Sequence, residues 1–140
     1  MSGQTAVSIF MGSKSDLPVV QCASDILKDF NISHNMFILS AHRTPEEVVK
    51  KIKESEANGV KVFIAAAGMA AHLAGAIAAQ TTKPVLGIPI GGGDLDGIDS
   101  LLATVQMPKG VPVATFAIGK SGAINAALCA VQILGTSSEE

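Results

Sequence analysis

Aromatic and charged residues are both scarce in this sequence. It has five Phe but no Trp or Tyr, and Asp, Glu, Lys and Arg make up only 16% of its 140 residues. Because 48% of the residues are apolar, the core must be built from Ala, Val, Ile and Leu, which pack helices closely against strands. A small domain this apolar has more apolar surface than one core hides, so we expect part of it to lie between subunits of an oligomer.

Basic surface and long apolar runs are missing as well. A net charge of −2 and an isoelectric point near 5.9 give no basic surface for nucleic acid. The richest apolar stretch, residues 60–79, is interrupted by Lys61, Gly68, His72 and Gly75, so we do not expect it to span a membrane. The N-terminal segment lacks the basic and long apolar regions of a signal peptide. We therefore expect a cytoplasmic protein without nucleic-acid or membrane partners.

No pattern of cysteine or of metal ligands is present. Cys22 and Cys129 lie far apart in apolar helical patterns, and we expect both to be buried free thiols rather than a disulfide. No set of Asp, Glu and His has metal-ligand spacing, and no arrangement of Ser, His and Asp resembles a hydrolase triad. The sequence therefore predicts no metal site and no hydrolase site.

Short apolar runs of strand length alternate five times with amphipathic stretches of helix length. This alternation is typical of an α/β protein whose parallel sheet is covered on both faces. The expected strands are 6–11, 35–39, 60–66, 85–90 and 113–117, and the last three helices are expected at 71–80, 97–105 and 121–134. Five such units in residues 1–140 favour one domain with a flavodoxin-like, doubly wound sheet in the strand order 2-1-3-4-5, which is a three-layer αβα sandwich.

The second helix has clear signals at both ends. Thr44 is the expected N-cap, Pro45 the first helical residue, and Glu47 the partner of Thr44 in a capping box. Asn58 and Gly59 indicate its C-terminal end.

Polar side chains follow the first two predicted strands. Ligands of such sheets bind beyond the carboxyl ends of the strands, at the switch between strands one and three. Residues 12–16, with Ser13, Ser15 and Asp16, either hold a phosphate through hydroxyls and free amides or only cap the next helix. His42 and Arg43 follow strand two and should face the same crevice. There an imidazole can exchange protons near neutral pH, and a guanidinium can bind phosphate or carboxylate.

Two further loops remain open to more than one interpretation. Most of residues 67–75, which follow strand three, are Gly or Ala. His72 among them is either a structural histidine with its hydrogen bonds satisfied or part of the site. Residues 91–94 after strand four either close over a ligand or form only a loop. His34 precedes strand two, at the other end of the sheet, and is expected to be structural. Residues 119–121 imitate the end of a P-loop, but Ala114 stands where that motif requires glycine.

Four segments together resemble the N5-carboxyaminoimidazole ribonucleotide mutase family, which is the class I aminoimidazole ribonucleotide carboxylase catalytic subunit family. They are MGSKSD at 11–16, SAHRTPE at 40–46, AAGMAAHLAG at 66–75 and DSLLATVQMPKGVPVATFAIGKSGAINAAL at 99–128. The resemblance covers nearly the whole chain. It implies a flavodoxin-like fold, an octamer, no metal and no organic cofactor. It also implies an isomerase of purine (IMP) biosynthesis that moves a carboxylate, through CO2, from N5 to C4 of the imidazole.

The resemblance also assigns residues to roles. Ser13, Ser15 and Arg43 are similar to ligands of the nucleotide phosphate, Asp16 to a ribose contact, and His42 to the proton shuttle. The remaining substrate-binding positions that it implies are Ser40, Gly68, Ala70, His72 and Leu73. The chain departs from the family pattern at Met69 and Ala74, where glycine and proline are usual, and in the glycine-rich, acidic loop at 91–97.

Three other functions compete with the mutase. The sister enzyme carboxylates aminoimidazole ribonucleotide directly with CO2, and its segment after strand three usually has a Ser-Asn pattern that differs from AAHLAG here. A non-catalytic nucleotide-binding module would not require the titrating His42. A phosphoacceptor signalling domain would require clustered carboxylates after strand one, where only Asp16 stands.

Overall fold

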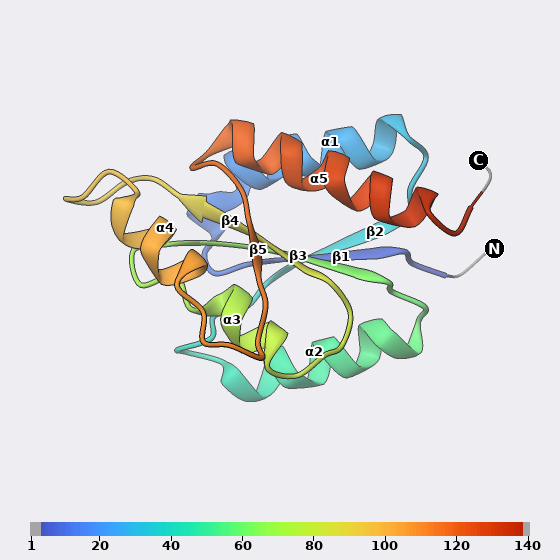
Figure 1. Cartoon of the computed structure of the whole chain (residues 1–140), viewed down its shortest axis with the longest axis horizontal. Coiled ribbons are helices and arrows are strands. Elements are labelled where there is room, and N and C mark those ends of the chain that lie inside the picture. Colours follow the sequence, from blue (N-terminus) through green and yellow to red (C-terminus); the bar gives the residue numbers. More distant parts are fainter. Residues whose placement is uncertain (1–3, 139–140) are drawn as a thin grey trace.

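A five-stranded parallel sheet forms the centre of the computed structural model, which describes residues 4–138. The strand order is β2-β1-β3-β4-β5, which confirms the predicted flavodoxin-like topology (Figure 1). The strands are β1 (Val7–Met11), β2 (His34–Ile38), β3 (Val62–Gly68), β4 (Val85–Ile90) and β5 (Ala114–Thr115).

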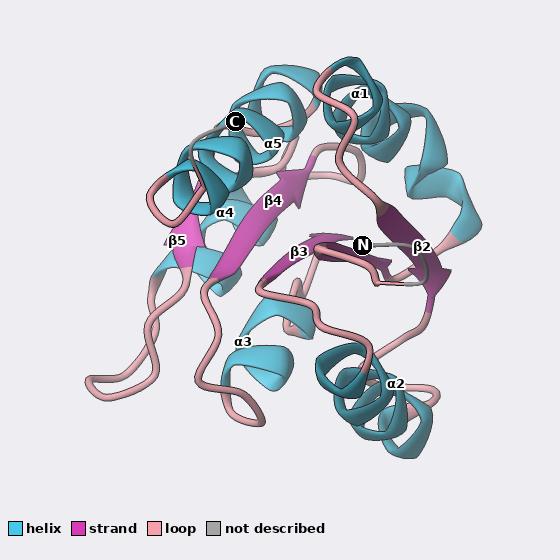
Figure 2. Ribbon diagram, turned by 90° about the vertical axis from the view of Figure 1, so that its right-hand side faces the viewer, coloured by secondary structure: helices cyan, strands magenta, loops and turns pink. Residues whose placement is uncertain are grey.

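Helices cover both faces of this sheet. α1 (Leu17–Asp29), which follows the short 3₁₀ helix η1 (Lys14–Asp16), packs with α5 (Lys120–Gly135) on one face. The other face carries α2 (Pro45–Ala57), α3 (Leu73–Ala78) and α4 (Ile98–Val105). Figure 2 shows these outer layers with the sheet between them. No helix among residues 4–138 is long and apolar enough to cross a membrane.

The alternation of side chains along the strands divides the core into two clusters. On β1, Val7, Ile9 and Met11 pack with α1 and α5, whereas Phe10 packs with α2 and α3. The Phe10 ring makes edge contacts with Phe37 and Phe63, at centroid distances of 5.5 and 6.0 Å. β1 is therefore anchored from both sides, as expected for a central strand of a covered parallel sheet.

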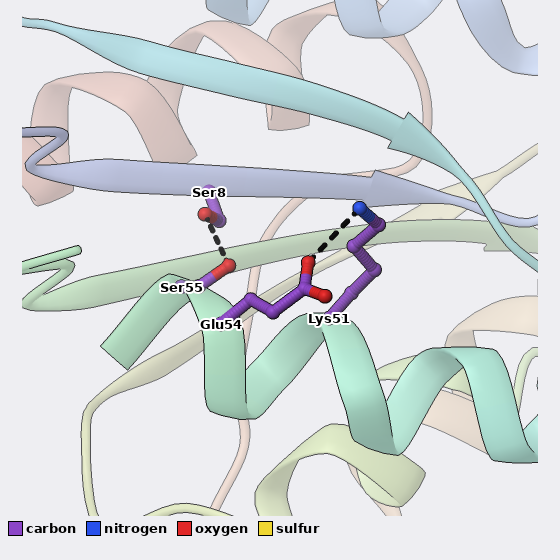
Figure 3. A network of polar contacts seen from close by, with 4 residues as sticks. All are labelled: Ser8, Lys51, Glu54 and Ser55. Atoms are coloured by element: carbon purple, nitrogen blue, oxygen red, sulfur yellow. Dashed lines mark hydrogen bonds and ion pairs between the residues drawn. The ribbon is translucent and has the colours of Figure 1, made fainter. Parts of the chain in front are cut away.

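A polar contact ties α2 to the centre of the sheet. Ser8 on β1 donates a buried hydrogen bond from its hydroxyl to Ser55 on α2, with 2.9 Å between the oxygens (Figure 3). Nearby, Lys51 bonds Glu54 at 3.0 Å and lies over the Phe37 ring. These contacts fix α2 against β1 and β2, and α2 begins directly after the loop that carries His42.

Some predicted details are wrong. Thr44 is the N-cap of α2, but its side chain makes no cap hydrogen bond. Its hydroxyl instead bonds the N–H and C=O of Ser40, both at 3.1 Å, so the predicted capping box with Glu47 is absent. β5 is shorter than the predicted 113–117 because Pro89 on β4 has no N–H to extend the pairing. The Pro89 carbonyl accepts from Gly119 N–H instead, at 2.9 Å.

The other boundaries agree to different degrees. β4 has the predicted bounds, while α3 has only six residues, where 71–80 was predicted. The helix begins late because 69–72 form tight turns, in which Ala71 N–H bonds Met69 C=O and His72 N–H bonds Ala70 C=O. Cys22 and Cys129 are free thiols as predicted, but both are half-buried rather than buried.

Candidate active site

A cavity of about 370 Å³ lies beyond the carboxyl ends of the strands. The loops after β1, β2, β3 and β4 form its walls. All ten residues that the sequence singled out for the site line this one cavity: Ser13, Ser15, Asp16, Ser40, His42, Arg43, Gly68, Ala70, His72 and Leu73. The structure therefore brings all ten residues to one cavity.

The loop after β1 is closed by its own side chains. The Ser13 hydroxyl accepts from Ser15 N–H at 3.3 Å, and the Asp16 carboxylate accepts from Ser13 N–H at 3.2 Å, which makes a capping box at η1. The hydroxyls of Ser13 and Ser15 also bond each other at 3.0 Å. The capping interpretation of this loop is thus confirmed, and the same residues still face the cavity.

Among residues 4–138, Asp16 is the one carboxylate that lines the cavity. Its side chain is buried, and this burial raises the pKa of the carboxyl above its ordinary value of 3.8, while the hydrogen bond from Ser13 acts in the opposite direction. The backbone hydrogen bond occupies one carboxylate oxygen, Oδ2. The other oxygen can accept a hydrogen bond from a ligand.

The loop after β2 is held by one serine. The Ser40 hydroxyl accepts from His42 N–H at 3.2 Å and from Arg43 N–H at 3.1 Å, and Thr44 closes the same turn. This arrangement leaves the side chains of His42 and Arg43 exposed at the cavity. Ser40 therefore organises the loop, a role that the sequence did not indicate.

The loop after β3 brings a second imidazole to the first. His72 immediately precedes α3, and its Nδ1 lies 2.8 Å from Nε2 of His42. The two rings are nearly perpendicular, at 86°. His34, in contrast, begins β2 at the opposite end of the sheet, where it bonds Ser24 at 2.7 Å and the Ile32 carbonyl at 2.8 Å. The structural interpretation of His34 is confirmed.

Several cavity residues were missing from the predicted site. Met69 has a positive φ of 50°, and its exposed side chain lies against Gly93. The other residues that line the cavity are Gly12, Ala41, Ala67, Ile90, Gly91, Gly92 and Gly93. Gly91, Gly92 and Gly93 belong to the loop at 91–94, whose role the sequence left open, and Ile90 is the last residue of β4. Within residues 4–138, no group of three or more His, Cys, Asp and Glu side chains is placed to hold a metal ion.

Comparisons with known proteins identify the family of the chain. The chain is 52% identical over 134 residues to N5-carboxyaminoimidazole ribonucleotide mutase from Escherichia coli (strain K12), which covers 96% of this chain and 79% of that protein. It is 50% identical over 137 residues to the protein of that name from Bacillus subtilis (strain 168), covering 98% and 85%.

Other similar proteins include a carboxylase and a crystal structure. Phosphoribosylaminoimidazole carboxylase from Ogataea methanolica is 51% identical over 134 residues, which span 96% of this chain but only 24% of that protein. The crystal structure of Treponema denticola PurE superposes with a TM-score of 0.87 at 31% identity, covering 97% of this chain and 84% of that one. The model of the AIR carboxylase family matches residues 6–140. The chain belongs to the AIR carboxylase family.

Proposed function

We propose that residues 1–140 form one catalytic domain that converts N5-carboxyaminoimidazole ribonucleotide into 4-carboxy-5-aminoimidazole ribonucleotide, a step of de novo IMP synthesis. The observation that carries the proposal is the position of His42 in a cavity whose walls also supply hydroxyls, a guanidinium and small residues. Similarity to proteins named for this reaction supports it.

The binding roles follow from the chemistry of the three loops. The hydroxyls of Ser13 and Ser15 and the exposed guanidinium of Arg43 suit a phosphate, because hydroxyls donate single hydrogen bonds and arginine donates several in a planar fork. The free carboxylate oxygen of Asp16 suits a ribose hydroxyl. These assignments place the nucleotide between the loops after β1 and β2, with its base toward His42.

The reaction needs a group that both gives and takes one proton. The bond between N5 and the carboxyl carbon breaks and releases CO2, and His42 protonates N5, which keeps the electron pair. C4 then attacks the same CO2, and His42 removes the C4 proton to restore the aromatic ring. The proton gained by N5 balances the one lost by C4, so no acid or base is consumed. Such an acid/base group contributes about 10²- to 10⁴-fold to a rate.

Small residues complete the cavity beside His42. Gly68 and Ala70 present almost no side chain, which leaves room for a linear three-atom CO2 molecule. Holding CO2 next to C4 replaces a second-order capture from solution by a reaction within the complex.

The decisive experiment compares two substrates without metal or ATP. The protein should rapidly convert N5-carboxyaminoimidazole ribonucleotide, and it should form little product from aminoimidazole ribonucleotide and bicarbonate. Efficient use of the second pair would identify a direct carboxylase instead. If neither substrate reacts although the nucleotide binds, the chain is a binding module.

A substitution at His42 tests the role of the imidazole. His42→Asn retains a polar side chain of similar shape but cannot exchange protons, so we expect kcat to fall by about 10²-fold or more. Binding of the nucleotide should be largely unchanged, as measured by calorimetry. Retention of most of the activity would remove His42 from acid/base catalysis.

We also propose that the protein is an octamer in the cytoplasm. The support for assembly is a stripe of apolar side chains that runs along α4 and the residues before it. Leu95, Ile98, Leu102 and Val105 recur at helical spacing and are 59, 53, 52 and 44% exposed. The cytoplasm is the expected location because phosphorylated nucleotides do not cross membranes and must be used where they are made.

A further inference from the structure

The contact between His42 and His72 joins loops from strands that are not neighbours. β1 lies between β2 and β3 in the sheet, yet the loops after β2 and β3 bring the two rings to a centroid distance of 4.9 Å. Nε2 of His42 and Nδ1 of His72 are 2.8 Å apart, and both side chains line the cavity. The acid/base role of His42 is therefore coupled to a second ring.

A hydrogen bond between two imidazole nitrogens holds a single proton. One nitrogen must carry the proton and the other must be bare, because two protons or two lone pairs would repel. Within residues 4–138, the outer nitrogens, Nδ1 of His42 and Nε2 of His72, have no hydrogen-bond partner. No protein group among the described residues therefore competes with a ligand for either nitrogen.

Only one of the two arrangements lets His42 act on the substrate while the bond stays intact. If His72 donated the proton, Nε2 of His42 would be occupied as acceptor and its Nδ1 would already be protonated. Neutral His42 would then have no nitrogen with which to accept a proton. If His42 donates from Nε2, its Nδ1 is bare and free to take the proton of C4. The imidazolium that results keeps the same bond to His72.

We propose that His72 is a positioning residue for the reaction, which accepts a hydrogen bond at Nδ1 from Nε2–H of His42 and thereby directs Nδ1 of His42 to the substrate. This inference rests on the proposed mutase function. His72 then carries its own proton on Nε2, where it can donate to a carboxylate oxygen in the cavity. The bond stabilises His42 in both its neutral and its protonated form, so the ring need not reorient between giving and taking the proton.

The tautomers can be observed without substrate. The chain has only three histidines, so ¹⁵N-histidine labelling gives few ring signals. His34 is an internal reference, because its Nδ1 can only donate to the Ile32 carbonyl. At a pH at which the rings are neutral, we expect protonated Nε2 and bare Nδ1 on both His42 and His72. A wild-type spectrum with protonated Nδ1 and bare Nε2 on His42 would overturn the proposal.

Two substitutions of His72 separate the hydrogen bond from the volume of the ring. His72→Asn places an amide oxygen near the position of Nδ1 and can accept the same bond, whereas His72→Leu fills similar space without an acceptor. We expect His72→Leu to lower kcat by about 10²-fold and to disperse the His42 tautomers. His72→Asn should restore the Nε2–H signal of His42, and its kcat should be at least tenfold higher than that of His72→Leu.

A double substitution distinguishes positioning from structural damage. If His72 acts through His42, His72→Leu should have little further effect on kcat in a His42→Asn background, whereas independent effects would multiply. If the effects of the two substitutions on kcat multiply, or if His72→Leu has the kcat of the wild type, the positioning role of His72 is refuted. The proposed mutase function is not affected by either result. If the wild type turns over neither substrate, the proposed function fails, and the tautomer result still decides whether the hydrogen bond has the stated direction.

Discussion

At the scale of single residues, the Arg43 side chain is placed to bind a ligand rather than to stabilise the fold. Its backbone N–H bonds Ser40, but the guanidinium is exposed at the cavity. Arg43→Ala should therefore leave the fold intact and raise KM for the phosphate-bearing substrate by about 10- to 100-fold, because a hydrogen bond to a charged group contributes about 1.5–3 kcal/mol. Lys14→Ala is the matched control, since Lys14 is exposed in the neighbouring loop but does not line the cavity. Equal KM values for the two variants would remove Arg43 from the phosphate site.

Asp16 provides a prediction about pH and stability. Because burial raises the pKa of its carboxyl, the folded state binds the Asp16 proton more tightly than the unfolded chain does. Ionisation of Asp16 therefore lowers the free energy of unfolding as the pH rises above the ordinary value of 3.8. Asp16→Asn cannot ionise but still offers an acceptor to Ser13 N–H. We expect the variant to be more stable than the wild type at neutral pH and the difference to shrink as the pH falls toward 3.8.

Urea denaturation at several pH values measures this difference. Asp25→Asn on α1 is the control, because it makes the same chemical change at an exposed position. An Asp16→Asn variant that is less stable than the wild type at neutral pH would contradict the assignment.

Residue types and their positions after strands predicted that the loops after β1 and β2 share a cavity, which includes His42 and Arg43. Ser40, Gly68, Ala70 and Leu73 entered the predicted site only through the family resemblance. What the sequence could not give was the pairing of the side chains. The contact between His42 and His72 depends on loops that cross the end of β1, and no local pattern encodes that distance. The capping box at Thr44 was wrong for a related reason, since the hydroxyl found a closer partner in the turn at Ser40.

At the scale of elements, the start of α5 depends on a glycine. A Cβ added to Gly122 would lie 1.7 Å from the Ala117 carbonyl oxygen, which belongs to the backbone between β5 and α5. Gly122→Ala should therefore displace this segment and destabilise the protein by about 3 kcal/mol or more. Gly135→Ala, at the other end of α5, meets nothing within 4 Å and should have a small effect. Thermal denaturation of both variants tests the contrast, and equal melting temperatures would contradict it.

The predicted bounds of a strand were right where its own residues set its length. They were wrong where a neighbouring strand limited its pairing. β4 is buried at every position and has its predicted bounds. β5 pairs with only one strand, and its length is limited by Pro89 on that neighbour. A proline in another strand lies outside any local window, so the shortening could not be read from residues 113–117.

At the scale of the whole molecule, the apolar stripe on α4 predicts how copies associate. Leu102→Glu would place a charge in the middle of the stripe, 52% exposed in the single chain. We expect it to shift the protein toward smaller species in light scattering coupled to size-exclusion chromatography, because a buried unpaired carboxylate is costly. Lys53→Glu on the exposed side of α2 changes the net charge by a larger amount and should leave the assembly intact. An unchanged molar mass for Leu102→Glu would exclude α4 from the interface.

The two ends of the described chain lie together, at the other end of the sheet from the loops that line the cavity beside His42. Gln4 and Ser138 line the same cavity at the amino end of the sheet, and Figure 1 shows both ends on the side away from the carboxyl ends of the strands. We therefore expect the site to form even when the βα units are connected in a different order along the chain. Circularly permuted chains, joined through a short linker at these ends and reopened in the loop at 79–84, should bring the same imidazoles together. A sensor or carrier protein attached at either end should likewise leave the cavity beside His42 open.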